Sequence, residues 1–249
     1  MSEISALFGA GAEAYANYRP QYPDALFDWL AQHSPQRLRA LDIACGNGQA
    51  SHPLRRHFAQ VLACDASLEQ LHAGRDWQGI QRFAADASAL PLATASLDLI
   101  VVAQALHWFA SPAFFAEVRR LLKPDGLFCA WCYGLTRIDS RLDTLIENFY
   151  GNTLAGYWLD GRASVEAGYR DIALPLPGIA VPDLALEAVW NLDQLTGYLR
   201  TWSAVQRWER QHGRDPVAEL TPALRRAWGD SKQPRPVRWP LHFLAGIAR

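Results

Sequence analysis

The chain has 249 residues, half of them apolar, and a formal net charge of −1 at neutral pH. This composition can bury a sizeable core, which argues against intrinsic disorder and suits one large α/β domain, with or without a substantial insertion. The sequence shows no basic stripe, so nucleic acids and anionic membranes are disfavoured as partners, and a small-molecule substrate is expected.

The first third of the chain alternates short apolar runs with amphipathic segments. Pro20 ends one predicted helix, and Pro23 stands in the first turn of the next. The predicted elements are, in chain order, a helix at 12–17, a helix from Pro23, a strand at 38–44, a helix at 49–58, a strand at 60–64, a helix at 68–73 and a strand at 80–84.

The next elements continue the alternation. Residues 97–103 are almost wholly apolar, as expected for a buried parallel strand, and a helix at 112–122 follows. Lys123–Gly126 forms a turn before a strand at 127–133. Strands alternating with helices predict βαβ units and a parallel sheet with right-handed crossovers.

Beyond Tyr133 the pattern changes and helices predominate. The predicted elements are a helix at 139–150, a mixed segment at 157–169, a strand at 184–190, helices at 192–212 and 216–228, and a last strand at 237–248. We predict a single domain over 1–249, divided into an N-terminal helical cap (1–35), a cofactor-binding core (36–133), substrate-shaping helices with an inserted strand (134–234) and the last strand (235–249).

A loop with two glycines, Gly46 and Gly48, joins the strand at 38–44 to the next helix. Glycines allow a tight turn and the close approach of a ligand to the backbone, although such turns also use glycine for purely structural reasons. Asp65 ends the next strand about 20 residues later, where a carboxylate can accept hydrogen bonds from ribose hydroxyls. The pair predicts a nucleoside-containing cofactor.

The loop departs from a dinucleotide fingerprint. Ser51 holds the place of the third glycine of G-x-G-x-x-G, and Asp42 precedes the loop. A carboxylate beside the loop would repel a pyrophosphate but would attract the ammonium and sulfonium groups of S-adenosylmethionine. The sequence therefore favours that cofactor.

Residues 41–49 resemble motif I of the class I S-adenosylmethionine-dependent methyltransferases, with Ala44 at the usual first glycine. Residues 64–67, 85–87, 97–108 and 121–126 resemble, in order, the ribose site, the adenine site, the strand and loop beside the methionine moiety, and the turn before the fifth strand of that family. The resemblance implies a Rossmann-like α/β fold with a seven-stranded, mostly parallel sheet, helices on both faces and a C-terminal helical lid insertion. Segments at 15–23, 103–109 and 197–203 resemble the trans-aconitate methyltransferase-like group (methyltransferase type 11).

The cofactor contacts predicted from the residues and from the resemblance are Tyr18, Arg19, Asp42, Ala44, Cys45, Gly46, Asn47, Gly48, Asp65, Ala66, Asp86, Ala87 and Gln104. Asp42 either anchors the loop alone or also contacts the methionine tail. Arg19 either clamps the tail carboxylate or is a solvated surface residue.

Four later residues are candidates for the acceptor site: His107, Trp108, Arg200 and Trp202. His107 follows the fourth strand and could act as a general base or position the acceptor, or it could simply be packed. Arg200 and Trp202 could bind an acidic acceptor. Because a carboxylate needs no general base and His107 is the one candidate base, the sequence favours a carboxylate acceptor.

Two alternatives to a small-molecule methyltransferase remain open on sequence alone: a nucleotide-binding oxidoreductase and a non-catalytic cofactor-binding module. A protein or nucleic-acid methyltransferase is disfavoured by the charge balance. The start of the chain lacks the pattern of a signal peptide, and the longest apolar run, Leu97–Leu106, is far short of a membrane span, so a cytoplasmic location is expected. Cys129 and Cys132 should point to opposite faces of a strand, and no metal site is predicted.

Overall fold

The computed structural model describes residues 20–74 and 76–249. The predicted helix at 12–17 and the candidate residues Tyr18 and Arg19 lie outside the described residues. The other candidate residues all lie within the described residues.

Seven strands form one sheet in the order β3-β2-β1-β4-β5-β7-β6. The first five in that order pair in parallel, whereas β7 runs antiparallel to both β5 and β6. The predicted seven-stranded, mostly parallel sheet is therefore confirmed. The strands are β1 (Arg39–Ile43), β2 (Gln60–Asp65), β3 (Ile80–Ala84), β4 (Leu97–Ala103), β5 (Leu122–Tyr133), β6 (Ala185–Trp190) and β7 (Arg235–Ile247).

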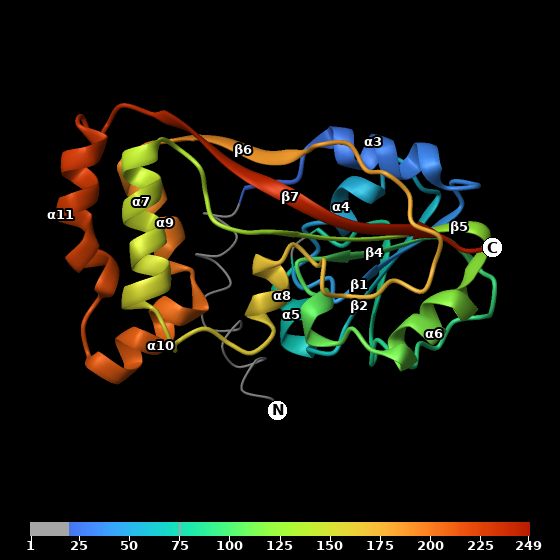
Figure 1. Cartoon of the computed structure of the whole chain (residues 1–249). Helices are drawn as coiled ribbons and strands as arrows, with labels where there is room; N and C mark the ends of the chain where they lie inside the picture. Colours follow the sequence, from blue (N-terminus) through green and yellow to red (C-terminus); the bar gives the residue numbers. More distant parts are fainter. Residues whose placement is uncertain (1–19, 75) are drawn as a thin grey trace.

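Helices lie on both faces of the sheet, and a second group of helices lies at one end of it (Figure 1). The helices beside the sheet are α3 (Asp24–His33), α4 (Ser51–Leu54), α5 (Leu68–Ala73), a 3-10 turn η1 (Leu106–Trp108), α6 (Pro112–Leu121) and α8 (Arg162–Glu166). The end group, here called the helical end, comprises α7 (Ser140–Asn148) with the π-turn η2 (Phe149–Thr153), α9 (Leu192–Arg200), α10 (Ser203–His212) and α11 (Pro216–Trp228).

The sheet separates two hydrophobic clusters, and β5 contributes to both because its side chains alternate between the faces. On one face Trp131 meets Tyr22, with ring centroids 5.4 Å apart and the rings nearly perpendicular. On the other face Phe128 packs against Phe114 of α6, with centroids 6.1 Å apart. Both faces of the central strands are covered, as their near-continuous apolar sequence requires.

The tryptophans of the C-terminal half mainly build the core of the helical end. Trp190 and Trp239 pack edge to face with centroids 4.9 Å apart, and both contact Tyr198. The indole N–H of Trp239 donates to the Tyr198 hydroxyl at 3.1 Å, so both buried polar groups are satisfied. These aromatic side chains join the helices to strands β6 and β7.

Two predicted helices differ from the structure in extent. The helix at 49–58 shrinks to α4, because the amides of Arg55, Arg56 and His57 bond three residues back and tighten the chain into a 3-10 turn. The helix at 192–212 is two helices, because Trp202 takes an extended conformation between α9 and α10.

Strand β5 begins five residues earlier than predicted. Leu122 pairs with Leu97, and Leu127 pairs with Leu99. Between these two pairs β5 therefore uses five residues where β4 uses two. The surplus forms the predicted turn at 123–126, in which Asp125 has a φ of +62°. The turn is therefore a bulge inside the strand.

Cys129 and Cys132 belong to the clusters on opposite faces of β5, as their spacing predicts. All four cysteines are buried as free thiols. Within the described residues, no three His, Cys, Asp or Glu side chains are grouped to hold a metal ion. None of the helices described above is long and apolar enough to span a bilayer.

Candidate active site

A large pocket of about 1000 Å³ opens at the carboxyl ends of the parallel strands. Its walls come from the segments that follow β1 (44–50), β2 (65–70), β3 (85–88) and β4 (103–111). This is the edge at which open α/β sheets bind ligands, because the loops after adjacent strands diverge there. The position predicted from the sequence is therefore where this large pocket lies.

The segment after β1 makes the tightest turn of the pocket wall. Ala44, Gly46 and Gly48 all have left-handed backbone conformations, with φ of +55°, +55° and +88°. Ala44 thus occupies a conformation that favours glycine, at a cost of about 1–2 kcal/mol. A Cβ at Gly46 would have only the Gln70 amide oxygen within 4 Å, at 3.7 Å, so the backbone is open to the pocket.

Gly48, a predicted cofactor contact, does not line the pocket. It is buried beneath the loop, and a Cβ there would lie 2.9 Å from both the His52 ring and the Trp77 ring. The glycine is needed for the approach of those two rings. The predicted contacts Ala44, Cys45, Gly46 and Asn47 do line the pocket.

Asp65 lies at the end of β2 with both carboxylate oxygens oriented by backbone amides. Oδ2 accepts from the Gly46 N–H at 2.9 Å, and Oδ1 accepts from the Ser67 N–H at 2.8 Å. These bonds tie the first two loops together and fix the side chain on the pocket wall, next to Ala66. Each carboxylate oxygen has capacity for a further donor, so a ligand hydroxyl can be accepted there.

Asp42 lies behind the pocket wall and does not line the pocket, which favours its predicted role as an anchor of the loop. Its side chain is fully buried, and Oδ2 accepts from the Ser51 hydroxyl at 2.5 Å, whereas Oδ1 has no partner among the described residues. Burial, with a smaller contribution from the Asp65 charge, raises the pKa of Asp42 to about 7. The Asp42 charge is therefore a poor argument against a pyrophosphate.

The wall of the large pocket is acidic. Asp65, Glu69 and Asp86 line it, and no lysine, arginine or histidine does among residues 20–74 and 76–249. Three carboxylates without a basic side chain favour a ligand with positive charge and disfavour a diphosphate. A nucleoside that carries a sulfonium and an ammonium group fits this wall. Glu69 follows Asp65 into α5, on the same edge of the sheet.

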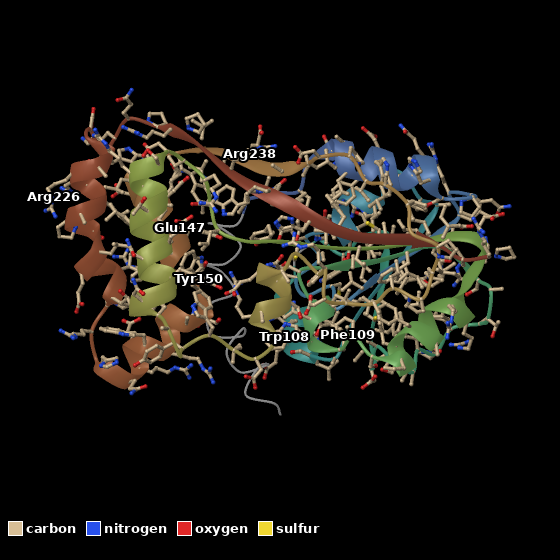
Figure 2. The ribbon with its side chains drawn as sticks, in the orientation of Figure 1. Trp108, Phe109, Glu147, Tyr150, Arg226 and Arg238 are labelled. Atoms are coloured by element: carbon tan, nitrogen blue, oxygen red, sulfur yellow. The ribbon has the colours of Figure 1, made fainter. Side chains whose placement is uncertain are left out.

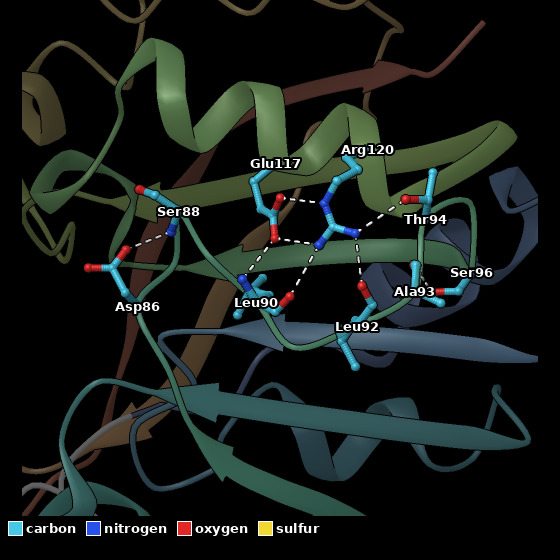
Figure 3. A network of polar contacts seen from close by, with 9 residues as sticks. All are labelled: Asp86, Ser88, Leu90, Leu92, Ala93, Thr94, Ser96, Glu117 and Arg120. Carbon is cyan, nitrogen blue, oxygen red and sulfur yellow. Dashed lines mark hydrogen bonds and ion pairs between the residues drawn. The ribbon is translucent and has the colours of Figure 1, made fainter.

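The segment that carries Asp86 and Ala87 is held by an ion pair between Glu117, which is nearly buried, and the partly exposed Arg120 (Figure 3). Glu117 of α6 accepts two hydrogen bonds from Arg120, at 2.7 and 2.6 Å, and a third from the Leu90 N–H at 2.8 Å. Arg120 also donates to the carbonyls of Leu90 and Leu92, at 3.1 and 2.8 Å. This network fixes residues 90–92, just after the predicted adenine contact.

Gln104 follows β4 with a φ of +56° and lines the pocket as predicted. Its amide bridges to the end of β5: Oε1 accepts from the Tyr133 N–H at 2.8 Å, and Nε2 donates to the Tyr133 carbonyl at 3.2 Å. The side chain acts as a further rung of the β4–β5 ladder, so its position on the pocket wall is rigid.

A small cavity of about 110 Å³ adjoins the large pocket, and Gln104 and Trp108 line both. Of the four residues predicted for the acceptor site, His107, Trp108 and Trp202 line this small cavity, whereas Arg200 does not. Arg200 donates to the Asp215 carboxylate at 2.8 Å on the surface of the helical end. The structure thus directs Arg200 to Asp215, at the start of α11, and not into the small cavity.

The small cavity also contains Arg162, which the sequence did not single out. It lies in a polar segment with no periodic pattern, and only the fold brings it to the sheet edge. The described residues that line the small cavity are Gln104, His107, Trp108, Tyr133, Gly134, Trp158, Leu159, Arg162, Tyr198, Thr201, Trp202 and Ser203.

His107 is neutral in this environment. Burial, and to a lesser extent the Arg162 charge, lowers its pKa to about 4. Its Nδ1 lies 3.2 Å from the Tyr169 hydroxyl, whose own pKa is raised by burial. A histidine with so low a pKa is a weak base, although it is available in its unprotonated form.

Residues 41–130 match the protein family described as "Methyltransferase domain". A methyltransferase-named protein of Dictyostelium discoideum is 30% identical over 233 residues, which cover 90% of this chain and 89% of that protein. A solved structure from Anaeromyxobacter dehalogenans, described as a type II methyltransferase, is 42% identical and covers 92% of this chain and 98% of that one, with a TM-score of 0.87. A malonyl-[acyl-carrier protein] O-methyltransferase of Xylella fastidiosa is 33% identical over 127 residues, covering 48% of this chain and 40% of its own.

Proposed function

The chain belongs to the S-adenosylmethionine-dependent methyltransferases of class I, and on that premise we propose that it methylates a small organic acid. The observation that carries the proposal is the small cavity that shares Gln104 and Trp108 with the large pocket. A volume of about 110 Å³ lined by aromatic side chains suits the compact part of a small molecule. The large pocket is the proposed site of S-adenosylmethionine.

We assign the cofactor contacts to the residues on the pocket wall. Asp65 would accept from the ribose hydroxyls, Asp86 from the adenine amino group, and the segment Ala44–Asn47 would face the methionine portion. The acidic wall formed with Glu69 would balance the positive groups of that portion. When bound, S-adenosylmethionine supplies a methyl group activated by a positively charged sulfur.

The protein's own contribution is alignment and the exclusion of water. The anchored amide of Gln104 and the indole of Trp108 stand between the two spaces, where the acceptor and the methyl group would meet. Because the pKa of His107 is lowered to about 4, His107 is poorly suited to deprotonate a hydroxyl or an ammonium group. A carboxylate acceptor needs no such base, and this supports an acid as substrate.

Two comparisons bear on the acceptor. The Xylella fastidiosa relative is by its name an O-methyltransferase of malonyl-[acyl-carrier protein], and a malonyl group ends in a carboxylate. The segments at 15–23, 103–109 and 197–203 resemble the trans-aconitate methyltransferase-like group, which we propose as the subgroup of this chain. The oxidoreductase and the non-catalytic module lose their basis with the family assignment.

Transfer of labelled methyl groups from S-adenosylmethionine tests the proposal. The purified protein is incubated with a panel of mono-, di- and tricarboxylic acids, and with alcohols and amines of the same carbon skeletons. We expect methylation of at least one acid and of none of the matched alcohols and amines. Methylation of an amine or alcohol in preference to every acid would contradict the proposed acceptor class.

A further inference from the structure

Helix α8 brings its first residue to the rim of the small cavity. Gly161, which precedes the helix, has a φ of +83° and lies against the turn η1, where a Cβ would be 3.1 Å from the His107 carbonyl oxygen. Only glycine combines this backbone conformation with this close approach. The helix therefore starts directly beside His107, and Arg162 lines the small cavity.

Arg162 is held in place by aromatic rings. Its guanidinium lies over the rings of Tyr150 and Trp158, 5.2 and 4.8 Å from their centroids, and its Nε donates to the Tyr150 hydroxyl at 2.7 Å. Figure 2 shows Tyr150 at the end of the α7 segment, so Arg162 also connects α8 to the helical end. Stacking of this kind fixes the plane of the guanidinium before any ligand arrives.

The two terminal nitrogens of Arg162 have no partner among the described residues. Two carboxylates of the same segment accept hydrogen bonds from hydroxyl groups: Glu166 accepts from Tyr150, and Asp171 accepts from Ser164. No aspartate or glutamate lines the small cavity within the described part of the chain. A half-buried cation with an oriented, unused pair of N–H donors is typical of a site for a carboxylate, which such a pair binds through both oxygens.

We propose that Arg162 binds a carboxylate of the acceptor in the small cavity and so determines the specificity of the enzyme for acids. The proposal rests on the function proposed above and adds the residue that recognises the substrate. A carboxylate held by Arg162 would lie among Trp158, Trp202 and Tyr198, so a planar, apolar skeleton is expected next to it. The acceptor would extend past Gln104 and Trp108 toward the large pocket, where a second carboxylate would receive the methyl group.

Calorimetric titration of the protein saturated with S-adenosylhomocysteine tests this site. The probes are benzoate, trans-cinnamate and fumarate, each beside its neutral amide. We expect at least one acid to bind at least tenfold more tightly than its amide, and Arg162→Gln to abolish that preference. Arg162→Lys keeps the charge but loses the paired donors, so it should retain part of the preference.

Arg200→Gln is the matched control, because Arg200 is an arginine of the same region that is paired with Asp215. It should leave the preference for acids unchanged. Equal binding of acids and amides, failure of all three acids to bind, or an unchanged preference in Arg162→Gln would overturn the site. Titration with S-adenosylhomocysteine distinguishes the two proposals: a protein that binds it but binds no acid lacks only the Arg162 site, whereas a protein that does not bind it contradicts the proposed cofactor site as well.

Discussion

Replacing Asp42 by asparagine should change how the stability of the protein depends on pH. Asp42 is fully buried with one oxygen unpartnered, and its pKa is raised from 3.8 to about 7. A group whose pKa is raised on folding is protonated in the folded state at pH values where the unfolded chain has released the proton. Its contribution to the free energy of unfolding is therefore largest below pH 4 and is lost as the pH rises to about 7.

The magnitude follows from the two pKa values. A difference of about 3 units is worth about 4 kcal/mol over the whole range, at about 1.4 kcal/mol per unit. Between pH 5 and pH 8 about 3 kcal/mol of this is lost. The asparagine side chain cannot ionise. The free energy of unfolding of the variant should therefore rise by about 3 kcal/mol relative to that of the wild type between pH 5 and pH 8.

Urea unfolding of the wild type and of Asp42→Asn, at pH 5 and at pH 8 without cofactor, measures this change. The free energy of unfolding of the variant minus that of the wild type is compared between pH 5 and pH 8. Any effect of the new amide that does not depend on pH cancels in this comparison. Asp183→Asn is the control, because its side chain is 88% exposed and should behave alike at both pH values. A difference between Asp42→Asn and the wild type that is the same at pH 5 and pH 8 would refute the reasoning.

Three further substitutions test the pocket. Asp65→Ala should weaken S-adenosylmethionine binding by about 1.5–3 kcal/mol, measured by calorimetry, and unchanged affinity would reject the ribose assignment. Glu117→Gln should raise the dissociation constant for S-adenosylmethionine and speed hydrogen exchange at the Leu90 amide. Exchange as slow as in the wild type would show that the ion pair does not hold that segment. Ala44→Gly should stabilise the protein by up to about 1 kcal/mol in urea unfolding, because it removes strain at a φ of +55°, and a clear loss of stability would contradict this.

Local sequence patterns predicted the elements that carry the pocket. Apolar runs bounded by polar residues placed β3 and β4 with their observed bounds, and the carboxylate that ends β2 identified the wall residue Asp65. These predictions succeed because the carboxyl ends of parallel strands share one edge, whatever the detailed packing.

The positions of several candidate site residues depend on tertiary partners that the sequence does not show. The burial of Asp42 depends on how the loop folds back to bring Ser51 against it, and Gly48 is required by Trp77, 29 positions further along. Arg200 and Arg162 are indistinguishable as arginines in a sequence. Arg200 forms an ion pair with Asp215, whereas Arg162 lines the small cavity. This difference arises from the packing of α8 against η1 and from the arrangement of the helical end.

Strand β7 has a mechanical consequence. Its residues 235–240 run along β6 and its residues 241–247 run along β5, with a single bridge between Arg137 and Arg238 across the first half. Strand β7 therefore connects the helical end, which packs on β6, to the rest of the sheet through one continuous backbone (Figure 1). The pairing of β7 changes from β6 to β5 between Pro240 and Leu241, so the relative position of the helical end and the parallel strands depends on the backbone at these two residues.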